Sequence, residues 1–566
     1  MQFSQRKLII VSPSKCSFLC LSLSLCVSSN AWAEASYHKA AKPIVDQQGR
    51  TRVIVDFTDE AYQAYPRDLL INFDPKKAMQ QPQALALIKD YEQKFGFVRQ
   101  GVTTWVGASV TAYLTTQQVE QLKVDRNVRL LTEDSYQQLS APATPPTWYP
   151  SWNGPAWGEL NDWGRTAVNG KTVLPGSGRK VYIIDSGVAY HNDLSSVSQR
   201  VNVNCGTGAD CSGTAVSPLG VGYYPTVGCY AHGTHVAGIV GADANNGAPR
   251  AGVYAGVNMV SVALGITPGK YNGSGAWTPC AGSYIAASTV GYAFDFIAAQ
   301  NQPTGPIPHP VSVATLSLNS GGLGFTGGVA ETNRSKLMTM VNPAVVWRYR
   351  GGLLEEWYYP GIFFTQSAGN QNQNACNPYK GYSAAFQTAP SPTGTAVDGI
   401  MVVGAIRSDG TAVSDLNGPA SGPYFTQPEP RIFGASSTEP GSNFGNCVDI
   451  WAPGDFIYST WGSGFYATYS TGSYSGGQPS SYVPGSAPGN PTTLYSGAPP
   501  VGFYGWQWLS GTSMAAPHVA AAAAYFADKY SLSTPAAIEQ KIRDNWQYWG
   551  ALDPLGFPVR IVYLPD

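Results

Sequence analysis

Hydrophobic and polar positions from about residue 150 onward alternate between short, continuously apolar runs and longer helical stretches. The apolar runs predict strands that are buried on both faces of a parallel sheet, at residues 180–185, 259–263, 311–318, 361–365 and 401–403. The segments between them predict helices, among them residues 235–242, 284–299 and 513–530. This alternation predicts an α/β fold with a doubly wound, mostly parallel sheet flanked by helices. Such a fold gathers its functional site at the carboxyl ends of its strands.

The segment from residue 34 to about residue 140 follows a different pattern, because it is richer in charge and poor in Gly and Pro. It predicts a small α+β unit, with strands at residues 51–58, 106–114 and 128–132 and helices at residues 82–95 and 116–123. The proline-rich stretch APATPPTWYPSWNGP that follows predicts an exposed linker. A compact unit joined by an exposed linker suits a propeptide, although a permanent binding module fits the same pattern.

Two long segments of the larger part do not follow the strand and helix alternation. These are residues 321–358 and the Gly/Ser/Tyr-rich residues 461–506. We predict that both are surface excursions rather than separate domains. The second comes shortly before Ser513 and either shapes the entrance to a site or is a plain solvent loop.

The first 33 residues have the pattern of a signal peptide. Arg6 and Lys7 precede an apolar stretch at residues 18–27, and Ala31-Trp32-Ala33 fits the small-x-small cleavage pattern, so we expect cleavage before Glu34. The apolar stretch is too short to span a bilayer, and no other segment is long and apolar enough. The sequence therefore predicts a secreted protein with no membrane partner.

Charge argues against two classes of partner. Charged residues make up 12% of the chain, well below the roughly 25% that is usual for globular proteins. The formal net charge is −1, which gives no electrostatic case for binding nucleic acid or an anionic membrane. We expect a monomer with a neutral, polar surface.

The cysteines favour disulfides. Removal of the predicted signal peptide leaves six of the nine cysteines, at positions 205, 211, 229, 280, 376 and 447. An even number in an exported protein favours disulfides, and metal ligation is the alternative. The chain has no CxxC pair and only six histidines, which speaks against a metal site.

Three segments place a polar side chain beside glycine at a strand end or a helix start. They are VYIIDSGV with Asp185, YAHGTHVAGIVGA with His232, and SGTSMAAPHVA with Ser513. Acyl transfer by a nucleophile needs a hydroxyl, a base for its proton and a carboxylate that orients the base. A helix N-terminus adds N–H donors for a developing oxyanion. Each segment alone has a structural interpretation, as a turn, a structural histidine or a helix cap, but the three together favour catalysis.

These segments resemble the three signature blocks of the subtilisin-like serine proteases, the subtilases, in that family's order of Asp, His and Ser. The resemblance implies that Asp185 orients the base, His232 is the general base and Ser513 is the nucleophile. His235 and His518 match the non-catalytic histidines of the same blocks, and we interpret both as structural.

Two further segments resemble the blocks that bind substrate in this family. TQSAGN ends at Asn370, whose side chain would join the Ser513 N–H in binding the oxyanion. TLSLNSGG resembles the substrate strand, which implies that Ser317, Leu318 and Asn319 pair with an extended peptide. Asn319 stands where the family usually has glycine, at the mouth of the primary specificity pocket. The facing strand is either the Gly-Ser-Gly at residues 273–275 or the Gly-Ser at residues 282–283.

SNFGNCVDIWAPG, at residues 442–454, is similar to a block of the proteinase K-like branch of the family. The resemblance implies three disulfides: Cys376–Cys447, Cys229–Cys280 and, with the remaining two cysteines, Cys205–Cys211. Cys229 lies just before His232, so a free thiol beside the base is the alternative for it.

The segment at residues 34–140 also resembles the inhibitory propeptide of the family, which has a ferredoxin-like fold and lies in the active-site cleft until self-cleavage. The resemblance therefore implies a signal peptide at 1–33, a propeptide at 34–140 and a catalytic domain at 141–566. The implied function is a secreted serine endopeptidase that hydrolyses polypeptides through an acyl-enzyme and processes itself. The chemistry requires no cofactor. Family members often bind calcium, but no acidic loop is specific enough to name metal ligands here.

Two other functions are compatible with parts of the pattern. A binding protein on the same scaffold would have no need to keep the triad and Asn370. An esterase of the α/β-hydrolase type would require a GxSxG elbow and the order Ser, Asp, His, and this sequence has neither.

Overall fold

The computed structural model describes residues 34–40, 42–66, 80–138, 163–175, 177–188, 191–203, 231–246, 250–264, 270–271, 277–278, 284–303, 310–317, 327–350, 353–376, 397–407, 431–432, 441–455, 457–461 and 505–566. Several predictions fall on other residues. They are the signal peptide, the proline-rich linker, Leu318, Asn319, the pairs Cys205–Cys211 and Cys229–Cys280, both choices of facing strand and almost all of the segment 461–506.

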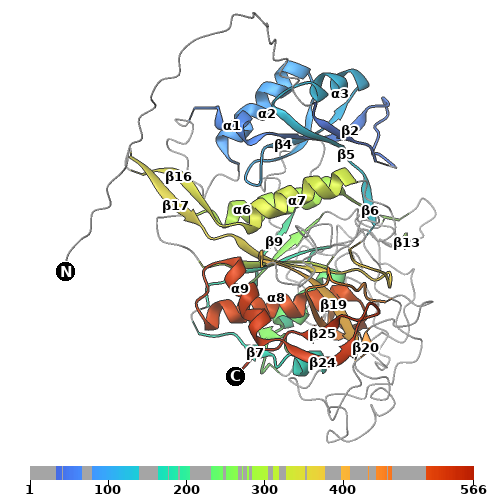
Figure 1. Ribbon diagram of the computed structural model, residues 1–566, viewed down its shortest axis with the longest axis vertical. Coiled ribbons are helices and arrows are strands. Elements are labelled where there is room, and N and C mark those ends of the chain that lie inside the picture. Colours follow the sequence, from blue (N-terminus) through green and yellow to red (C-terminus); the bar gives the residue numbers. More distant parts are fainter. Residues whose placement is uncertain are drawn as a thin grey trace, which may run out of the picture. The chain divides into compact units, whose positions relative to one another are not determined.

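The N-terminal unit contains a five-stranded mixed sheet in the order β1-β5-β2-β4-β3 (Figure 1). Its elements are β1 (Ser36–His38), β2 (Thr51–Phe57), α1 (Asp59–Gln63), α2 (Pro82–Phe95), β3 (Arg99–Thr103), β4 (Ser109–Leu114), α3 (Thr116–Lys123) and β5 (Val128–Glu133). The run from β2 to β5 has the β-α-β-β-α-β order of ferredoxin-like folds with one additional short helix, α1, before α2, and the predicted α+β unit is confirmed. Gly96, with a φ of 67°, ends α2 in the left-handed conformation that glycine adopts without strain.

The larger part is built on a sheet in the order β24-β25-β21-β19-β18-β15-β8-β11-β9. The strands are β8 (Val181–Asp185), β9 (Val197–Asn202), β11 (Met259–Ala263), β15 (Ser312–Leu316), β18 (Ile362–Ser367), β19 (Ile400–Arg407), β21 (Ile450–Pro453), β24 (Gln547–Leu552) and β25 (Pro558–Ile561). All neighbouring pairs along this path are parallel except β24 with β25, so the doubly wound, mostly parallel sheet is confirmed. β9 and β11 lie on one side of β8, and the later strands β15, β18, β19 and β21 lie on the other, so the carboxyl end of β8 is at the topological switch point.

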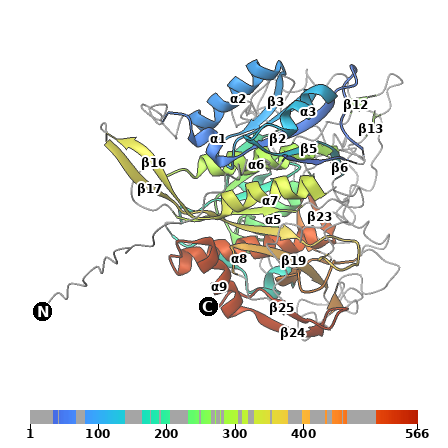
Figure 2. The same cartoon turned by 45° about the horizontal axis from the view of Figure 1, so that its top comes forward.

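Helices cover both faces of this sheet (Figures 1 and 2). Along β8, Val181 and Ile183 belong to one buried apolar cluster with α5 (Ala231–Gly241) and α8 (Thr512–Lys529). Tyr182 and Ile184 point to the opposite face, where they join a cluster with α6 (Ala287–Gln300) and α7 (Gly327–Val341). Residues on consecutive positions are therefore buried, which is why the strands read as continuous apolar runs.

Helix α8 lies against the centre of the sheet, and every residue from 512 to 527 is buried. Its run of alanines lets the helix backbone approach the strands closely, because no side chain longer than a methyl group separates them. The following helix, α9 (Pro535–Asn545), packs beside it.

The interpretation of residues 321–358 as a surface excursion is wrong for residues 327–341. These residues form α7, whose Leu337, Met340 and Val341 are fully buried in the core. The sequence GGVAETNRSKLMTMV lacks an apolar stripe because α7 is covered on two sides, by the sheet and by the N-terminal unit. Only the hairpin that follows, β16 (Ala344–Arg350) and β17 (Leu353–Tyr359), extends outward (Figure 2).

Helix α6 also begins later than the sequence indicates. Residues Tyr284–Ala286 form a short strand, β14, that pairs antiparallel with β6 (Tyr136–Gln138) of the N-terminal unit. The helix starts at Ala287, directly after this pairing. Local sequence cannot reveal this strand, because its partner lies almost 150 residues earlier in the chain.

Polar and charged groups join the N-terminal unit to α6 and α7. Lys336 Nζ of α7 lies 3.2 Å from Asp56 Oδ1, and Thr332 Oγ1 donates to Asp56 Oδ2 at 2.9 Å. On α6, Ser288 Oγ donates to Asp134 Oδ2 at 2.8 Å. Asp295 Oδ1 accepts three backbone N–H bonds, from residues 104, 105 and 106, at 2.9, 2.6 and 3.0 Å. These contacts bury charge as well as apolar surface.

In the part of the chain that the structure describes, no helix is both long enough and apolar enough to cross a membrane.

Candidate active site

The carboxyl edge of the central strands brings the first site residues together. Leu316 of β15 lies opposite Ile184 of β8 and Gln366 of β18 in the parallel register. The next residues along the three strands are therefore Asp185, Ser317 and Ser367, which sit side by side at the switch point. Ser317 was predicted to bind substrate, and this register places it beside Asp185.

Asp185 and His232 form a hydrogen-bonded pair. Asp185 is fully buried at the end of β8, and its Oδ1 and Oδ2 lie 2.8 and 3.0 Å from Nδ1 of His232. Asp185 Oδ1 also accepts the Ser186 N–H at 2.6 Å. A Cβ atom at Gly233 would lie 2.3 Å from the carbonyl oxygen of Gly187, so only glycine allows the start of α5 to approach β8 this closely.

This pairing fixes the roles of the two imidazole nitrogens. Nδ1 of His232 donates to the carboxylate, and Nε2 is buried without a hydrogen-bond partner among the described residues. Burial alone would lower the pKa of His232, but the charge of Asp185 and the hydrogen bond to it raise that pKa above its ordinary value. The neutral imidazole is therefore held in the tautomer whose Nε2 lone pair accepts a proton.

The raised pKa of His232 predicts the acid limb of the activity profile. A general base acts only when it is neutral, so kcat/KM should rise with pH as His232 loses its proton. The midpoint should lie above about 6.5, the value of an unperturbed histidine. The measurement is kcat/KM for a peptide substrate between pH 4 and 9 at constant ionic strength. A midpoint well below that of a free histidine would contradict the Asp185–His232 ion pair.

Ser513 is the second residue of α8, and its side chain is tied to the end of β15. Its Oγ donates to the carbonyl oxygen of Ser317 at 3.0 Å, while Ser317 Oγ donates to the carbonyl oxygen of Ser513 at 3.0 Å. The second bond is available because Pro517 has no N–H, so the Ser513 carbonyl has no partner one turn later in the helix. The proline thus leaves an acceptor for Ser317 and links α8 to the carboxyl edge of the sheet.

Asn370 lies beside the start of α8 in the loop after β18. Its Oδ1 accepts bonds from the backbone N–H and the Oγ1 of Thr512, both at 2.8 Å. Thr512 Oγ1 in turn accepts the Gly369 N–H at 3.0 Å. The Nδ2 of Asn370 is buried and has no hydrogen-bond partner in the described part of the chain. A Cβ atom at Gly511 would lie 3.0 Å from this nitrogen, so glycine keeps the space in front of it open.

The two other histidines of the signature blocks are buried in the core and bond backbone carbonyl groups. His518 is fully buried, and its Nδ1 lies 2.8 Å from the carbonyl oxygen of Met514, so Nδ1 carries the proton. Burial, together with the nearby charge of Arg250, lowers the pKa of His518 to about 3. His235 is also fully buried, and its Nε2 lies 3.1 Å from the carbonyl oxygen of Ile457. His518 therefore remains neutral, and both histidines bond backbone carbonyl groups, as a structural role requires.

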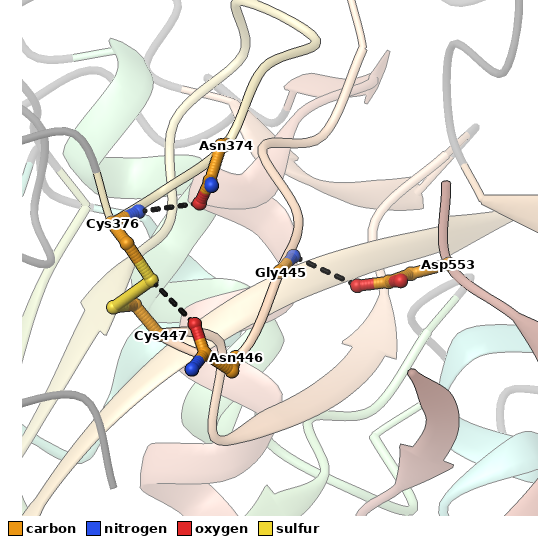
Figure 3. The surroundings of a disulfide bond; sticks show 6 residues. All are labelled: Asn374, Cys376, Gly445, Asn446, Cys447 and Asp553. Atoms are coloured by element: carbon orange, nitrogen blue, oxygen red, sulfur yellow. Dashed lines mark hydrogen bonds between the residues drawn. A yellow bond between two sulfur atoms is a disulfide. The ribbon is translucent and has the colours of Figure 1, made fainter. Parts of the chain in front are cut away.

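A disulfide joins the loop that carries Asn370 to the block at residues 442–454. Cys376 and Cys447 are bonded, with their Cα atoms 5.3 Å apart, and this is the pairing that the sequence predicted (Figure 3). Close to it, Asn374 Oδ1 accepts the backbone N–H of Cys376 at 2.9 Å.

Sequence reasoning missed two residues that support the site, Thr512 and Asn443, and one of the two roles of Ser317. Ser317 was assigned to substrate only, but it also bonds Ser513 in both directions. Thr512 orients Asn370, and its place directly before the serine in GTSMA was an available signal. Asn443 holds the loop around Asn370, and nothing in SNFG distinguishes it from an ordinary turn residue. No group of three or more potential metal ligands lies together among the described residues.

Asp185 and His232 are paired, and Ser513 at the start of α8 lies close to Asn370, which bonds Thr512. The Ser513 hydroxyl is bonded to the Ser317 carbonyl, and His232 Nε2 has no hydrogen-bond partner in the described part of the chain. A carboxylate, an imidazole and a hydroxyl are the groups that a serine hydrolase requires. The chain belongs to the Subtilase family, whose model matches residues 176–556.

Two curated relatives show how far the likeness extends. Alkaline serine exoprotease A of Vibrio alginolyticus is 24% identical over 335 residues, which cover 59% of this chain and 38% of the relative. Subtilisin-like serine protease AsES of Sarocladium strictum is 25% identical over 353 residues, covering 62% of this chain and 54% of the relative. The chain thus spans between about two fifths and about half of the length of these relatives.

Solved structures are similar at lower identity. A cold-adapted subtilisin-like serine proteinase is 22% identical, with a TM-score of 0.38, over 71% of this chain and 98% of that one. Fervidolysin from Fervidobacterium pennivorans is 16% identical, with a TM-score of 0.48, over 94% of this chain and 62% of that one.

Proposed function

We propose that this chain is a secreted serine endopeptidase that is made as a self-processing preproprotein. The observation that carries the proposal is the assembly at the carboxyl edge of the sheet. There Asp185 pairs with His232 through Nδ1, and Ser513 opens α8 beside the unpartnered amide of Asn370. This combination supports the assignment of His232 as the base, Ser513 as the nucleophile and Asn370 as an oxyanion donor.

In the proposed reaction the Ser513 hydroxyl leaves the Ser317 carbonyl by a change of rotamer and attacks the scissile carbonyl carbon. Nε2 of His232 takes the hydroxyl proton, and Asp185 stabilises the imidazolium that forms. The tetrahedral oxygen accepts bonds from Asn370 Nδ2 and from the Ser513 N–H. His232 then gives its proton to the leaving amine, which produces an acyl-enzyme, and water releases the acid by the same steps in reverse.

We propose that polypeptides are the substrates, bound in an extended form. Ser317, Leu318 and Asn319 follow β15 at the carboxyl edge and would add a peptide as a further strand. β14, which pairs antiparallel with β6 of this same chain, supports the proposal as an example of strand addition to this part of the fold. The two curated relatives are named as proteases, which agrees with this substrate class.

We propose that residues 34–140 are an inhibitory propeptide. The support is their polar contact with α6 and α7 and the pairing of β6 with β14. Interfaces between parts that separate are more polar than permanent ones, and this contact includes Asp56, Asp134 and Asp295. The signal-peptide pattern and the Cys376–Cys447 disulfide both suit secretion, since disulfides persist in oxidising compartments.

Replacing Asn370 with alanine should lower kcat by about 10²–10³-fold, the range known for removing one oxyanion donor from a subtilisin. KM should change little, because the bond forms to the oxyanion rather than to the ground-state carbonyl. The matched control is Asn374→Ala, in the same loop, whose side chain bonds the Cys376 N–H instead. Steady-state kinetics on a chromogenic peptide measure both variants. If the two variants lost kcat equally, the assignment of Asn370 as an oxyanion donor would be wrong.

A further inference from the structure

Asn443 is a fully buried polar side chain in the block at residues 442–454, outside the triad. Its Oδ1 accepts the N–H groups of Gln371 and Gln373 at 3.1 and 3.2 Å. Its Nδ2 donates to the carbonyl oxygen of Ala368 at 2.9 Å and to Gln371 Oε1 at 3.1 Å. An asparagine amide has two acceptor sites and two donor hydrogens, so these four bonds use its whole capacity.

The partners of Asn443 enclose Asn370 along the chain. Ala368 lies two residues before it, and Gln371 and Gln373 lie one and three residues after it. The buried amide of Asn443 therefore bonds the loop on both sides of Asn370, the residue whose Nδ2 faces the site.

Backbone hydrogen bonds of Asn443 and of Gly441, which lies directly before the block, also hold the loop. The Asn443 N–H donates to the Gly369 carbonyl at 2.7 Å, and the Gly441 N–H donates to the Asn370 carbonyl at 3.2 Å. The Asn372 N–H donates to the Gly441 carbonyl at 2.8 Å. Asn372 has a φ of 51°, a left-handed conformation that asparagine adopts more readily than other non-glycine residues.

The block is in turn attached to rigid parts of the fold. Ser442 Oγ accepts the N–H of Ala405, in the middle of β19, at 3.0 Å. The Gly445 N–H donates to Asp553 Oδ2 at 2.8 Å, and the Cys376–Cys447 disulfide closes the far end (Figure 3). Asn443 thus lies between the sheet and the Asn370 loop, and the displacement of either would break its bonds.

We propose that Asn443 is a positioning residue that sets the Asn370 Nδ2 at the oxyanion site. The inference rests on the proposed peptidase function. An oxyanion donor stabilises the transition state only if it is held in place before charge develops, so the residues that hold it contribute to the rate. Thr512 fixes the Oδ1 end of the Asn370 side chain, and Asn443 fixes the backbone from which that side chain extends.

The test is a double-mutant cycle between Asn443 and Asn370. Asn443→Ala should lower kcat by about 10-fold or more, but by less than the loss of the donor itself, about 10²–10³-fold, with little change in KM. In the Asn370→Ala background the same substitution should have almost no further effect on kcat, because the group that it positions is gone. If Asn443 only stabilised the fold, the double variant would show the product of the two single losses of kcat. That result would overturn the proposal.

Asn443→Asp serves as the second variant if the alanine variant does not fold. The aspartate keeps both Oδ1 acceptor contacts but replaces the donor to the Ala368 carbonyl with a second oxygen, so kcat should fall with KM retained. Asn374→Ala is the control and should show no coupling to Asn370. An Asp variant that folds with wild-type kcat would overturn the proposal.

Variants that process themselves slowly should be cleaved with a trace of tagged wild-type enzyme, which is then removed by its tag. Mass spectrometry should verify that every variant has the same N-terminus. Labelling of Ser513 with a fluorophosphonate counts active sites. If the wild type itself neither cleaves peptides nor takes the label, the proposed function fails. If the wild type is active but the cycle is additive, only the role of Asn443 fails.

Discussion

Ser513→Ala should reduce peptidase activity by about 10⁶-fold, the loss known for the nucleophile of subtilisin. Ser513 is 2% exposed and lies at the first turn of α8, where its hydroxyl donates to the Ser317 carbonyl. Alanine removes that bond and the attacking oxygen without changing the backbone, since it is a good helix former. The fold should therefore remain intact while the chemistry is lost.

The same variant should stay as an uncleaved precursor, because the proposed processing uses the same serine. Mass spectrometry of the wild type should find an N-terminus between residues 136 and 150, and the variant should retain Glu34. Heat-inactivated wild type is the control for fluorophosphonate labelling. Self-cleavage of the variant at the wild-type rate would refute both the nucleophile and self-processing. Active wild type that still carries Glu34 would refute only the propeptide.

Asp185→Asn should reduce kcat by about 10⁴-fold, the loss seen when the orienting carboxylate of a catalytic triad becomes an amide. The carboxylate accepts the Nδ1–H of His232 at 2.8 Å, and the amide would offer a hydrogen to Nδ1 instead. That would favour the tautomer with its proton on Nε2, which cannot take the proton of Ser513. The lost negative charge should also move the acid limb of kcat/KM to lower pH, since that charge raises the pKa of His232.

The control for Asp185 is Asp243→Asn. Asp243 is a carboxylate of the same part of the fold, and its Oδ2 accepts the Ser195 N–H at 3.1 Å. Its activity and acid limb should match those of the wild type. If the two variants lost activity equally, a general loss of stability would explain the result and the orienting role of Asp185 would be wrong. Thermal unfolding of both variants provides the comparison.

The sequence predicted the central strands well because they are covered on both faces, and double burial produces continuous apolar runs such as VYIID in β8. The motif residues Asp185, His232 and Asn370 were also accessible, since each stands at the end of a recognisable strand or the start of a helix. What local sequence did not contain was the register of β15 against β8 and β18, and this register brings Ser317 to the site.

The errors have the same physical cause. Helix α7 lacks an apolar stripe because Thr332 and Lys336, which would face solvent on an ordinary helix, contact the N-terminal unit. β14 is a strand only because β6 pairs with it. In both places tertiary contacts determine the secondary structure, and the pattern of neighbouring residues in the sequence does not contain those contacts.

The contact of the N-terminal unit with α6 and α7 has a consequence for the separated protein. Many of the groups uncovered on the two helices would be ones that water solvates well, such as Ser288, Asp295, Thr332 and Lys336. A large apolar patch left bare would invite aggregation. If the N-terminal unit is cleaved off as proposed, these polar side chains regain their hydration, and the uncovered helices need no replacement partner to keep the protein dispersed.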